Sequence, residues 1–312
     1  KELLRFNNVF QTKGSAAVLM NIDNGNILSL VSLPDFDPNK RKNIKDKNYI
    51  NKITKGVYEL GSVFKTFTLA AALDENLIEV DTKFLDLKKS IVCGKNTIRE
   101  YDKKIPKDLT AEEILIRSGN IGSVRIGQKI GIEKFKSFLK KINVINQIEF
   151  DIDEMGVPIP FKWGKCKLAT ISFGHGITTT PLQLAKGYAI ISNGGFEINP
   201  TIIRKNKKRL IKYKKRIIKE NVSKEINPIL RKIVTSKEGT ANLADIKGYE
   251  IGGKTGTAEK IILGKYSSKK KINTFASVFP ISNPKFVLVV ILDEPQINTE
   301  YIYNYRDGSN FK

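Results

Sequence analysis

Strand-like segments lie at both ends of this sequence, and helical segments fill its middle. Near the start, residues 15–33 form two apolar runs joined by the turn signal Asp23-Asn24-Gly25. Near the end, Phe286–Leu292 is a run of apolar residues that suits a buried central strand. From Thr110 to Tyr188 the apolar residues recur mostly with helical periodicity. This order predicts one sheet assembled from both ends of the chain, with an all-helical lobe inserted.

The length and composition predict one large domain over residues 1–312, because 40% of the residues are hydrophobic and the chain is short for two domains. We expect a sheet lobe of about residues 1–85 and 200–312 and a helical lobe of about residues 86–199. Residues 86–105 look polar and irregular. The expected helices are Ser62–Leu73, Ala111–Ile116, Ile121–Ile130, Glu133–Lys141, Pro181–Ser192 and Lys224–Thr235, and the expected later strands are Tyr249–Gly253, Thr274–Phe279 and Phe286–Leu292.

The chain is strongly basic, with 54 Lys and Arg against 32 Asp and Glu and a formal charge of +22. Such a charge invites a nucleic-acid or anionic-membrane partner. The basic residues are scattered, however, and the single cluster is Arg204–Lys219. A DNA-binding footprint is normally clustered, so we expect solvated lysines, an exposed excursion at 204–219 and no nucleic-acid partner.

Cys93 and Cys166 are the two cysteines, and neither has the spacing of a metal ligand. We therefore expect no metal, and a disulfide between them stays open because their separation in space is unknown. The longest apolar run has seven residues, Phe286–Leu292, whereas a membrane-spanning helix needs about twenty. Because the chain begins at Lys1, we expect an N-terminal portion, with any anchor, to precede this fragment.

Three short motifs follow one another along the chain, at Ser62-Val63-Phe64-Lys65, Ser118-Gly119-Asn120 and Lys254-Thr255-Gly256-Thr257. Each is weak alone, since a lone serine at a helix start is more often an N-cap than a nucleophile. Their order and spacing are informative together. We expect Ser62 at the start of a helix, the second motif just before a helix, and the third at the end of a strand.

The first two motifs suit nucleophilic catalysis. Side chains three residues apart on a helix share a face, so the Lys65 amine can reach the Ser62 hydroxyl. Serine needs a base to become a good nucleophile, and lysine serves only if burial or a second cation such as Lys254 lowers its pKa. Ser118 can relay a proton to a leaving amine. Asn120 can bond a substrate amide and hold Lys65.

The third motif suits substrate binding. Gly256 lets a substrate backbone approach the strand closely. The hydroxyls of Thr255 and Thr257, together with Lys254, suit a terminal carboxylate. The backbone N–H groups of Ser62 and Thr257 are the expected oxyanion hole.

The three motifs together resemble the signature of penicillin-binding proteins and class A β-lactamases. Longer stretches resemble the class B, cell-division branch of the penicillin-binding proteins over about residues 14–296. These stretches are 35–39, 58–62, 97–101, 113–122, 173–177, 180–185, 254–260 and 292–296. The resemblance implies a mixed α/β fold of the serine β-lactamase/D,D-peptidase type, with a mainly antiparallel central sheet flanked by helices and an inserted all-helical subdomain.

The resemblance also implies a function. Ser62 would form an acyl-enzyme with the D-Ala-D-Ala end of a peptidoglycan stem peptide, an amine of a second stem would resolve it, and β-lactam antibiotics would acylate the same serine. No cofactor is implied. The implied partners are a septal glycosyltransferase and divisome proteins, at the periplasmic face of the inner membrane. We expect a membrane anchor and a pedestal domain outside this fragment, and a truncated C-terminal helix.

Other interpretations remain to be weighed. A serine β-lactamase or β-lactam sensor would share the fold, and Glu149 and Glu154 lie where a class A base would be sought, without the matching local motif. A basic nucleic-acid-binding module and a catalytically silent scaffold are further alternatives. His175 is the only histidine, but its Gly-His-Gly setting favours a place at the rim of the pocket over a Ser/His triad.

Overall fold

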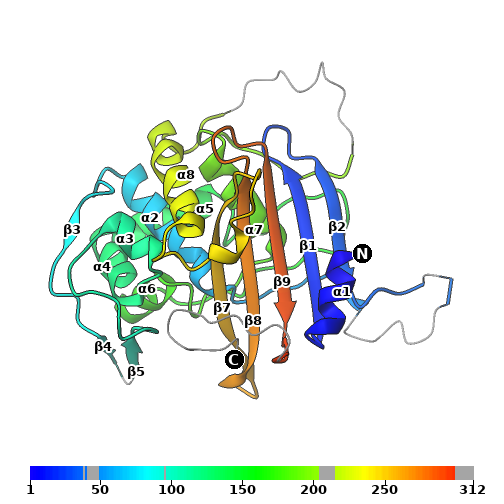
Figure 1. The fold of residues 1–312 in the computed structure, drawn as a ribbon, viewed down its shortest axis with the longest axis horizontal. Coiled ribbons are helices and arrows are strands. Elements are labelled where there is room, and N and C mark those ends of the chain that lie inside the picture. The colour runs from blue at the N-terminus through cyan, green and yellow to red at the C-terminus, as the bar shows by residue number, and fades with distance from the viewer. Residues whose placement is uncertain (38, 41–48, 95, 204–214, 299–312) are drawn as a thin grey trace.

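A five-stranded sheet forms the backbone of the fold in this computed structural model, which describes residues 1–37, 39–40, 49–94, 96–203 and 215–298 (Figure 1). All neighbouring strands are antiparallel, and their order is β2-β1-β9-β8-β7. The sheet therefore joins both ends of the chain, as predicted. Its strands are β1 (Gly14–Asn21), β2 (Ile27–Leu33), β7 (Gly252–Ile262), β8 (Lys265–Phe279) and β9 (Phe286–Asp293).

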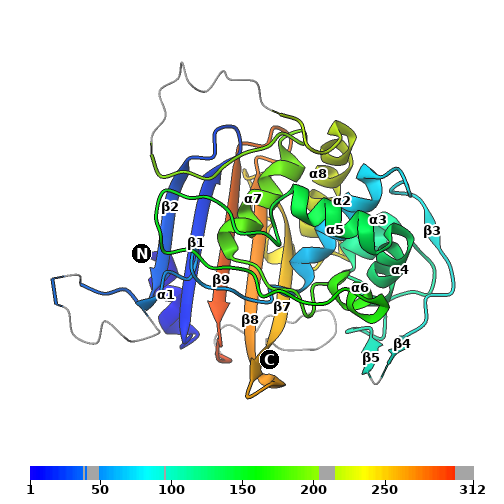
Figure 2. The same ribbon diagram turned by 180° about the vertical axis from the view of Figure 1, so that it is seen from behind.

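Helices from the middle of the chain cover one face of the sheet and extend past its β7 edge (Figures 1 and 2). The expected mixed α/β fold with an antiparallel sheet flanked by helices is thus confirmed. The division into two lobes stays a prediction. The helices are α1 (Glu2–Val9), α2 (Lys65–Asp74), α3 (Ala111–Ile116), α4 (Asn120–Ile130), α5 (Ile132–Lys141), α6 (Lys165–Ile171), α7 (Pro181–Ser192) and α8 (Glu220–Thr235).

Helix α7 is the main contact between the helices and the sheet. It begins where Thr180 and Gln183 form a capping box, with Pro181 in the first turn. All twelve of its residues are buried, and it packs against β1, β8 and β9. Alternate strand residues that face the helices are fully buried, which makes the core continuous from sheet to helices: Ala16, Val18, Met20, Ala276, Val278, Val287, Val289 and Ile291.

Several elements were not expected. The stretch 86–105 is not irregular, because β4 (Ser90–Cys93) and β5 (Asn96–Arg99) form a hairpin within it. Helices α1 and α6 and the short pair β3 (Lys83–Phe84) and β6 (Leu109–Thr110) were also missed. The strand expected at Tyr249–Gly253 begins only at Gly252 and then runs to Ile262. Its second half, Thr257–Ile262, is largely exposed and lacks the regular apolar alternation that marks a strand in a sequence.

A disulfide joins Cys93, at the end of β4, to Cys166 in α6, with the two Cα atoms 5.4 Å apart. The sequence alone had left this pairing open. The bond ties the β4–β5 hairpin to the helices across 73 residues of sequence. In the chain-entropy account, such a cross-link stabilises the fold mainly by restricting the unfolded chain.

Two predictions fall largely on residues outside the described part of the chain. The basic excursion lies mostly in 204–214, and the expected truncation of a C-terminal helix concerns 299–312. In the part that is described, no helix has both the length and the apolar character needed to cross a bilayer.

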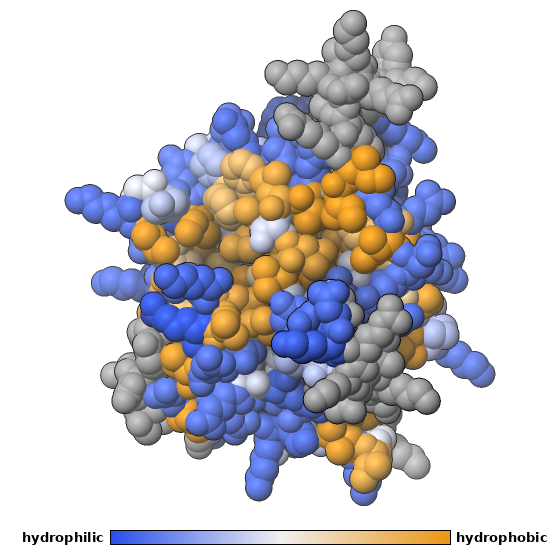
Figure 3. Space-filling model, turned by 90° about the vertical axis from the view of Figure 1, so that its right-hand side faces the viewer, coloured by the Kyte–Doolittle hydropathy of each residue, from blue (hydrophilic) through white to orange (hydrophobic). Residues whose placement is uncertain are grey.

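The β2 side of the molecule exposes apolar side chains. Leu28 and Val31 project from this edge strand into solvent. The space-filling view of that side shows a broad apolar area (Figure 3).

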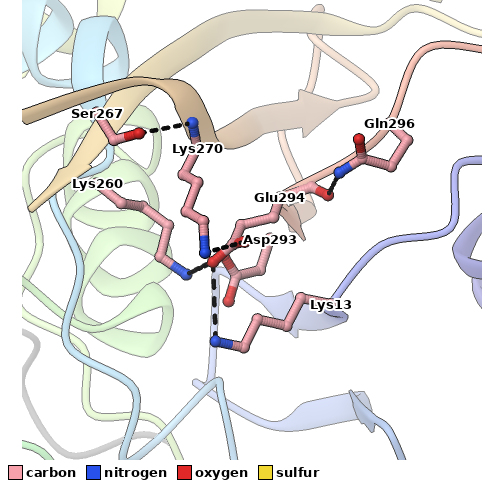
Figure 4. Close-up of polar contacts among 7 residues, drawn as sticks. All are labelled: Lys13, Lys260, Ser267, Lys270, Asp293, Glu294 and Gln296. Atoms are coloured by element: carbon pink, nitrogen blue, oxygen red, sulfur yellow. Dashed lines mark hydrogen bonds and ion pairs between the residues drawn. The ribbon is translucent and has the colours of Figure 1, made fainter. Parts of the chain in front are cut away.

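Asp293 and Glu294, at the end of β9, form an acidic pair that contacts lysines from three parts of the chain (Figure 4). Lys260 Nζ lies 2.6 Å from Asp293 Oδ1 and 2.7 Å from Glu294 Oε1. Lys13 and Lys270 approach Glu294 at 3.8 and 3.4 Å. Burial alone would raise the pKa of Glu294, but the hydrogen bond and charge of Lys260, with Lys13 and Lys270, hold it below its usual value. The pair therefore links the β7–β8 hairpin, at its bulge, to the start of β1.

We predict that Glu294→Gln lowers the free energy of unfolding by about 1–2 kcal/mol, because it leaves the charge of the half-buried Lys260 less well paired. Chemical denaturation at neutral pH measures this. Since the folded-state pKa of Glu294 is lowered, its stabilisation is present above the unfolded pKa, and the difference from the wild type should shrink as the pH falls below about 4. Glu2→Gln, in an exposed pair with Arg5, is the matched control and should change little. Equal effects of the two variants would contradict the prediction.

Candidate active site

The Ser62 segment is a tight turn followed by a buried helix. Residues Gly61–Phe64 form the 3-10 turn η2, in which the Ser62 carbonyl accepts the Lys65 N–H. Helix α2 begins only at Lys65, so the expected helix Ser62–Leu73 with Ser62 as its side-chain cap is wrong at this end. Neither η2 nor α2 has a side-chain cap. The Ser62 hydroxyl is therefore not used to cap the helix.

Backbone atoms of this turn and of β7 touch, because glycines occupy the contact points. A Cβ on Gly256 would lie 2.2 Å from the Leu60 carbonyl oxygen, and one on Gly61 would lie 2.4 Å from that of Thr257. Gly61 also has a positive φ of 66°. On the other side of the turn, a Cβ on Gly174 would lie 2.0 Å from the Gly61 oxygen. Any side chain at these positions would push β7 or the 174 loop away from Ser62.

The Lys65 amine is buried, and its hydrogen-bond partners belong to the motif Ser118-Gly119-Asn120. Only 1% of the residue is exposed. Its Nζ donates to the Ser118 carbonyl oxygen at 2.5 Å and to Asn120 Oδ1 at 2.7 Å, and the Ser118 hydroxyl lies 3.2 Å away. Burial lowers the pKa of Lys65 to about 7, although the nearby Glu100 carboxylate raises it. A substantial share of this lysine is therefore a neutral amine at neutral pH.

An unusual backbone conformation aims the Ser118 carbonyl at Lys65. Ser118 lies between α3 and α4 and has a φ of 57°, in the left-handed region that few non-glycine residues adopt. The Gly119 N–H donates to the Ile114 carbonyl oxygen and closes the end of α3. Such strain persists where surrounding structure enforces it, and it is common at functional sites.

The hairpin β4–β5 holds Asn120 in place, which the sequence did not indicate. The Glu100 carboxylate accepts the backbone N–H groups of Asn120 at 2.7 Å and Ile121 at 2.8 Å, at the start of α4. The Asn120 side-chain amide donates to the Arg99 carbonyl oxygen at 2.9 Å. The Tyr101 ring centroid lies 6.0 Å from Lys65 Nζ. Because these partners lie some twenty residues before Asn120, no local pattern pointed to them.

The Lys254 amine is the second buried amine of the site. Lys254 is 0% exposed, and its Nζ donates to the Thr255 carbonyl oxygen at 3.0 Å and to Thr240 Oγ1 at 3.4 Å. Burial and then the charge of Lys65 hold the pKa of Lys254 well below its usual value. Thr255 Oγ1 donates to Thr240 Oγ1 at 2.9 Å. Thr240 is a further site residue that no motif marked.

The third motif lies inside strand β7, near its beginning, and not at the end of a strand as expected. Among the residues that the structure describes, strand β7 is at the edge of the sheet and pairs with β8. Its Thr257 residue is exposed, whereas Lys254 and Gly256 are buried. The exposed threonine, and the edge of β7 that no described strand covers, therefore face away from the core.

The structure brings the three motifs together. Hydrogen bonds join Lys65 to Ser118 and Asn120, while backbone contact joins the Ser62 turn to Gly256 and Thr257. The roles expected of these residues stay predictions.

The other candidates are not bonded to these motif side chains in the contacts described. His175 Nδ1 faces Glu59 Oε2 at 3.7 Å, and its ring packs against that of Tyr266. Glu154 accepts the N–H of Asn51 at 2.8 Å. Among the described residues, no group of three His, Cys, Asp or Glu side chains could hold a metal ion.

Comparison with known proteins decides the family. A model of the penicillin binding protein transpeptidase domain matches residues 15–309. The chain belongs to this family. The expected class B penicillin-binding protein transpeptidase domain is thereby confirmed.

This transpeptidase domain has curated relatives. It is 31% identical over 95% of its length to the probable peptidoglycan D,D-transpeptidase FtsI of Caulobacter vibrioides, and 33% identical over 93% to peptidoglycan D,D-transpeptidase FtsI of Buchnera aphidicola. It covers 51% of each relative, so it spans about half their length.

A solved structure shares its fold. The TP domain of Burkholderia pseudomallei penicillin-binding protein 3 has a TM-score of 0.84 and 26% identity, covering 98% of this transpeptidase domain and 86% of that chain.

We predict that Gly256→Ala slows acylation of the transpeptidase domain by a penicillin about 10–100-fold, because the new methyl group displaces β7 from the Ser62 turn. The time course of labelling by a fluorescent penicillin measures this. Gly164→Ala is the matched control, since its φ is −178° and a Cβ there meets nothing within 4 Å. Unchanged labelling of Gly256→Ala would show that the close contact is not needed.

Proposed function

We propose that this domain is a serine D,D-transpeptidase that cross-links peptidoglycan stem peptides through an acyl-enzyme on Ser62. The observation that carries the proposal is the buried Lys65 amine, with a pKa lowered to about 7, one turn from a serine and held by the Ser118–Asn120 segment. The family relationship and the names of the relatives support the same reaction.

Lys65 is the proposed general base. A neutral lysine amine has two N–H bonds and one lone pair. The Ser118 carbonyl and Asn120 Oδ1 are two strong acceptors for the N–H bonds. The lone pair is then available to take the proton of the Ser62 hydroxyl, because side chains three residues apart in a helical turn lie on one face.

The edge of β7 is the proposed binding site for the donor stem. An extended peptide can add to an edge strand through main-chain hydrogen bonds. Lys254, Thr255 and Thr257 would bind the terminal carboxylate, and the N–H groups of Ser62 and Thr257 would form the oxyanion hole. The backbone contact between the Ser62 turn and β7 supports this placement.

The reaction balances as two acyl transfers. Ser62 Oγ bonds to the carbonyl carbon of the penultimate D-Ala, and the bond to the nitrogen of the terminal D-Ala breaks. That nitrogen receives the proton that left Ser62, through Lys65 and Ser118. An amine of a second stem then attacks the ester and gives its proton back to Ser62 Oγ. The products are a cross-linked peptide and free D-Ala.

The wider role also belongs to the proposal. We assign the domain to septal wall synthesis, at the periplasmic face of the inner membrane, together with a glycosyltransferase and division proteins. The names of the FtsI relatives support this assignment. β-Lactams would acylate Ser62 as substrate mimics, and the family description supports this.

We predict that Ser62→Ala abolishes covalent labelling by benzylpenicillin, since the attacking oxygen is gone. Intact-mass spectrometry followed by peptide mapping locates the adduct. Ser29→Ala, at an exposed position of β2, is the control and should label normally. An adduct that persists in Ser62→Ala would refute the proposal. Rapid release of the wild-type adduct would instead favour a β-lactamase or sensor.

The acylation rate of the wild type should rise with pH through about 7, as Lys65 loses its proton. Glu100→Gln should move the inflection to lower pH, because the carboxylate that favours the charged amine is removed. Stopped-flow acylation across the pH range measures both. Glu113→Gln changes a carboxylate in the first turn of α3 instead and should leave the inflection in place. A pH-independent rate in the wild type would exclude Lys65 as the base.

A further inference from the structure

One carboxylate next to the Ser62 turn bonds to two distant segments. Glu59 lies three residues before Ser62, and its side chain is 9% exposed. Its Oε2 accepts the Gly176 N–H at 2.9 Å, and its Oε1 accepts the Tyr266 hydroxyl at 2.9 Å. The three-motif signature includes none of these residues.

The first segment is the loop Gly174–Gly176, which contacts the Ser62 turn. Gly174 is in backbone contact with Gly61, as described above. Next to it, the His175 ring centroid lies 4.4 Å from that of Tyr266, and His175 Nδ1 lies 3.7 Å from the Glu59 carboxylate. Lys167 Nζ donates to the Gly176 carbonyl oxygen. Burial lowers the pKa of Lys167, and the charge of Glu59 opposes that lowering. Several donors thus surround Glu59.

The second segment is the outer part of the β7–β8 hairpin. The pairing of the two strands shifts between Glu259 and Lys260, where Lys271 and then Ser267 are the partners. Three residues of β8 are therefore extra, and such a bulge bends and twists a hairpin. Beyond the bulge, Leu263 at the tip is 99% exposed. The Tyr266–Glu59 bond is a contact that holds this outer part to the body of the domain.

We propose that Glu59 is a positioning residue. Its hydrogen bonds to Gly176 and Tyr266, here called the lock, hold the 174–176 loop and the outer β7–β8 hairpin against the turn that carries Ser62. The lock sets how closely β7 approaches that turn, and it does so without touching the reacting atoms. Its catalytic consequence rests on the proposed function.

The burial of Glu59 and its two hydrogen bonds favour this positioning role over that of a residue in a surface ion pair. The carboxylate is largely removed from solvent, and its two oxygens accept from different segments, one of them 207 residues away in sequence. Hydrogen bonds to a charged acceptor are among the stronger ones in proteins. Because Gly61 and Gly256 leave no spare space between the turn and β7, a small movement of the hairpin is transmitted to the Ser62 site.

The test is a double-mutant cycle on acylation by a fluorescent penicillin, resolved into the binding constant and the first-order acylation rate. Tyr266→Phe and Glu59→Ala should each lower the acylation rate about 5–20-fold, while Ser62 is still labelled to completion. The double variant should be no slower than Glu59→Ala, because Glu59→Ala already breaks the bond that Tyr266→Phe removes. Glu59→Gln, which keeps an acceptor oxygen, should be intermediate. Additive effects, or no effect of Tyr266→Phe, would overturn the lock.

Amide hydrogen exchange tests the role of Glu59 independently of the proposed function. Glu59→Ala and Tyr266→Phe should speed amide exchange in residues 260–267, whereas Tyr249→Phe, at an exposed tyrosine, should not. Unchanged exchange in 260–267 would overturn the lock even if acylation is normal. Wild-type protein that forms no acyl adduct would overturn the proposed function, and the exchange result would still decide the lock.

Discussion

The Lys65 amine lies where water cannot solvate its charge, and the geometry of the site follows from that burial. Desolvation makes the ammonium form costly, so the amine loses its proton far more readily than in water. The same burial requires acceptors for the remaining N–H bonds, and the left-handed turn at Ser118 supplies one of them. A buried lysine and a strained serine both reduce stability. Their presence in one place is the pattern expected of a site maintained for chemistry rather than for folding.

The second constraint is the absence of side chains between the Ser62 turn and β7. These two segments are far apart in sequence, and the fold brings their backbones into direct contact. Gly61 and Gly256 allow carbonyl oxygens of each segment to lie where a methyl group would otherwise be. The width of the site is thus determined by main-chain contact, which varies less than contact between flexible side chains.

Local signals made some of the fold predictable. Helices α3 and α7 have the predicted bounds, because each begins with a capping box, at Thr110 and Thr180. The order of the motifs likewise pointed to Ser62, Lys65 and Lys254. The start of α2 was misplaced because the 3-10 turn before it depends on contact with β7, which is a tertiary effect.

The partners Glu100 and Thr240 could not be predicted for the same kind of reason. They reach the motifs across 15 to 20 residues of chain, and no periodicity links residues so arranged. The pairing of Cys93 with Cys166 also depends on a separation in space that sequence spacing does not report.

The disulfide between Cys93 and Cys166 also bears on the surroundings of Lys65. Cys93 closes one strand of the hairpin whose other strand ends at Arg99, beside Glu100, and these two residues orient the Asn120 amide that holds Lys65. The disulfide is therefore linked through this hairpin to the hydrogen bonds around the Lys65 amine. An oxidising compartment favours this bond, which removes one way for the hairpin beside Asn120 to move away from the helices.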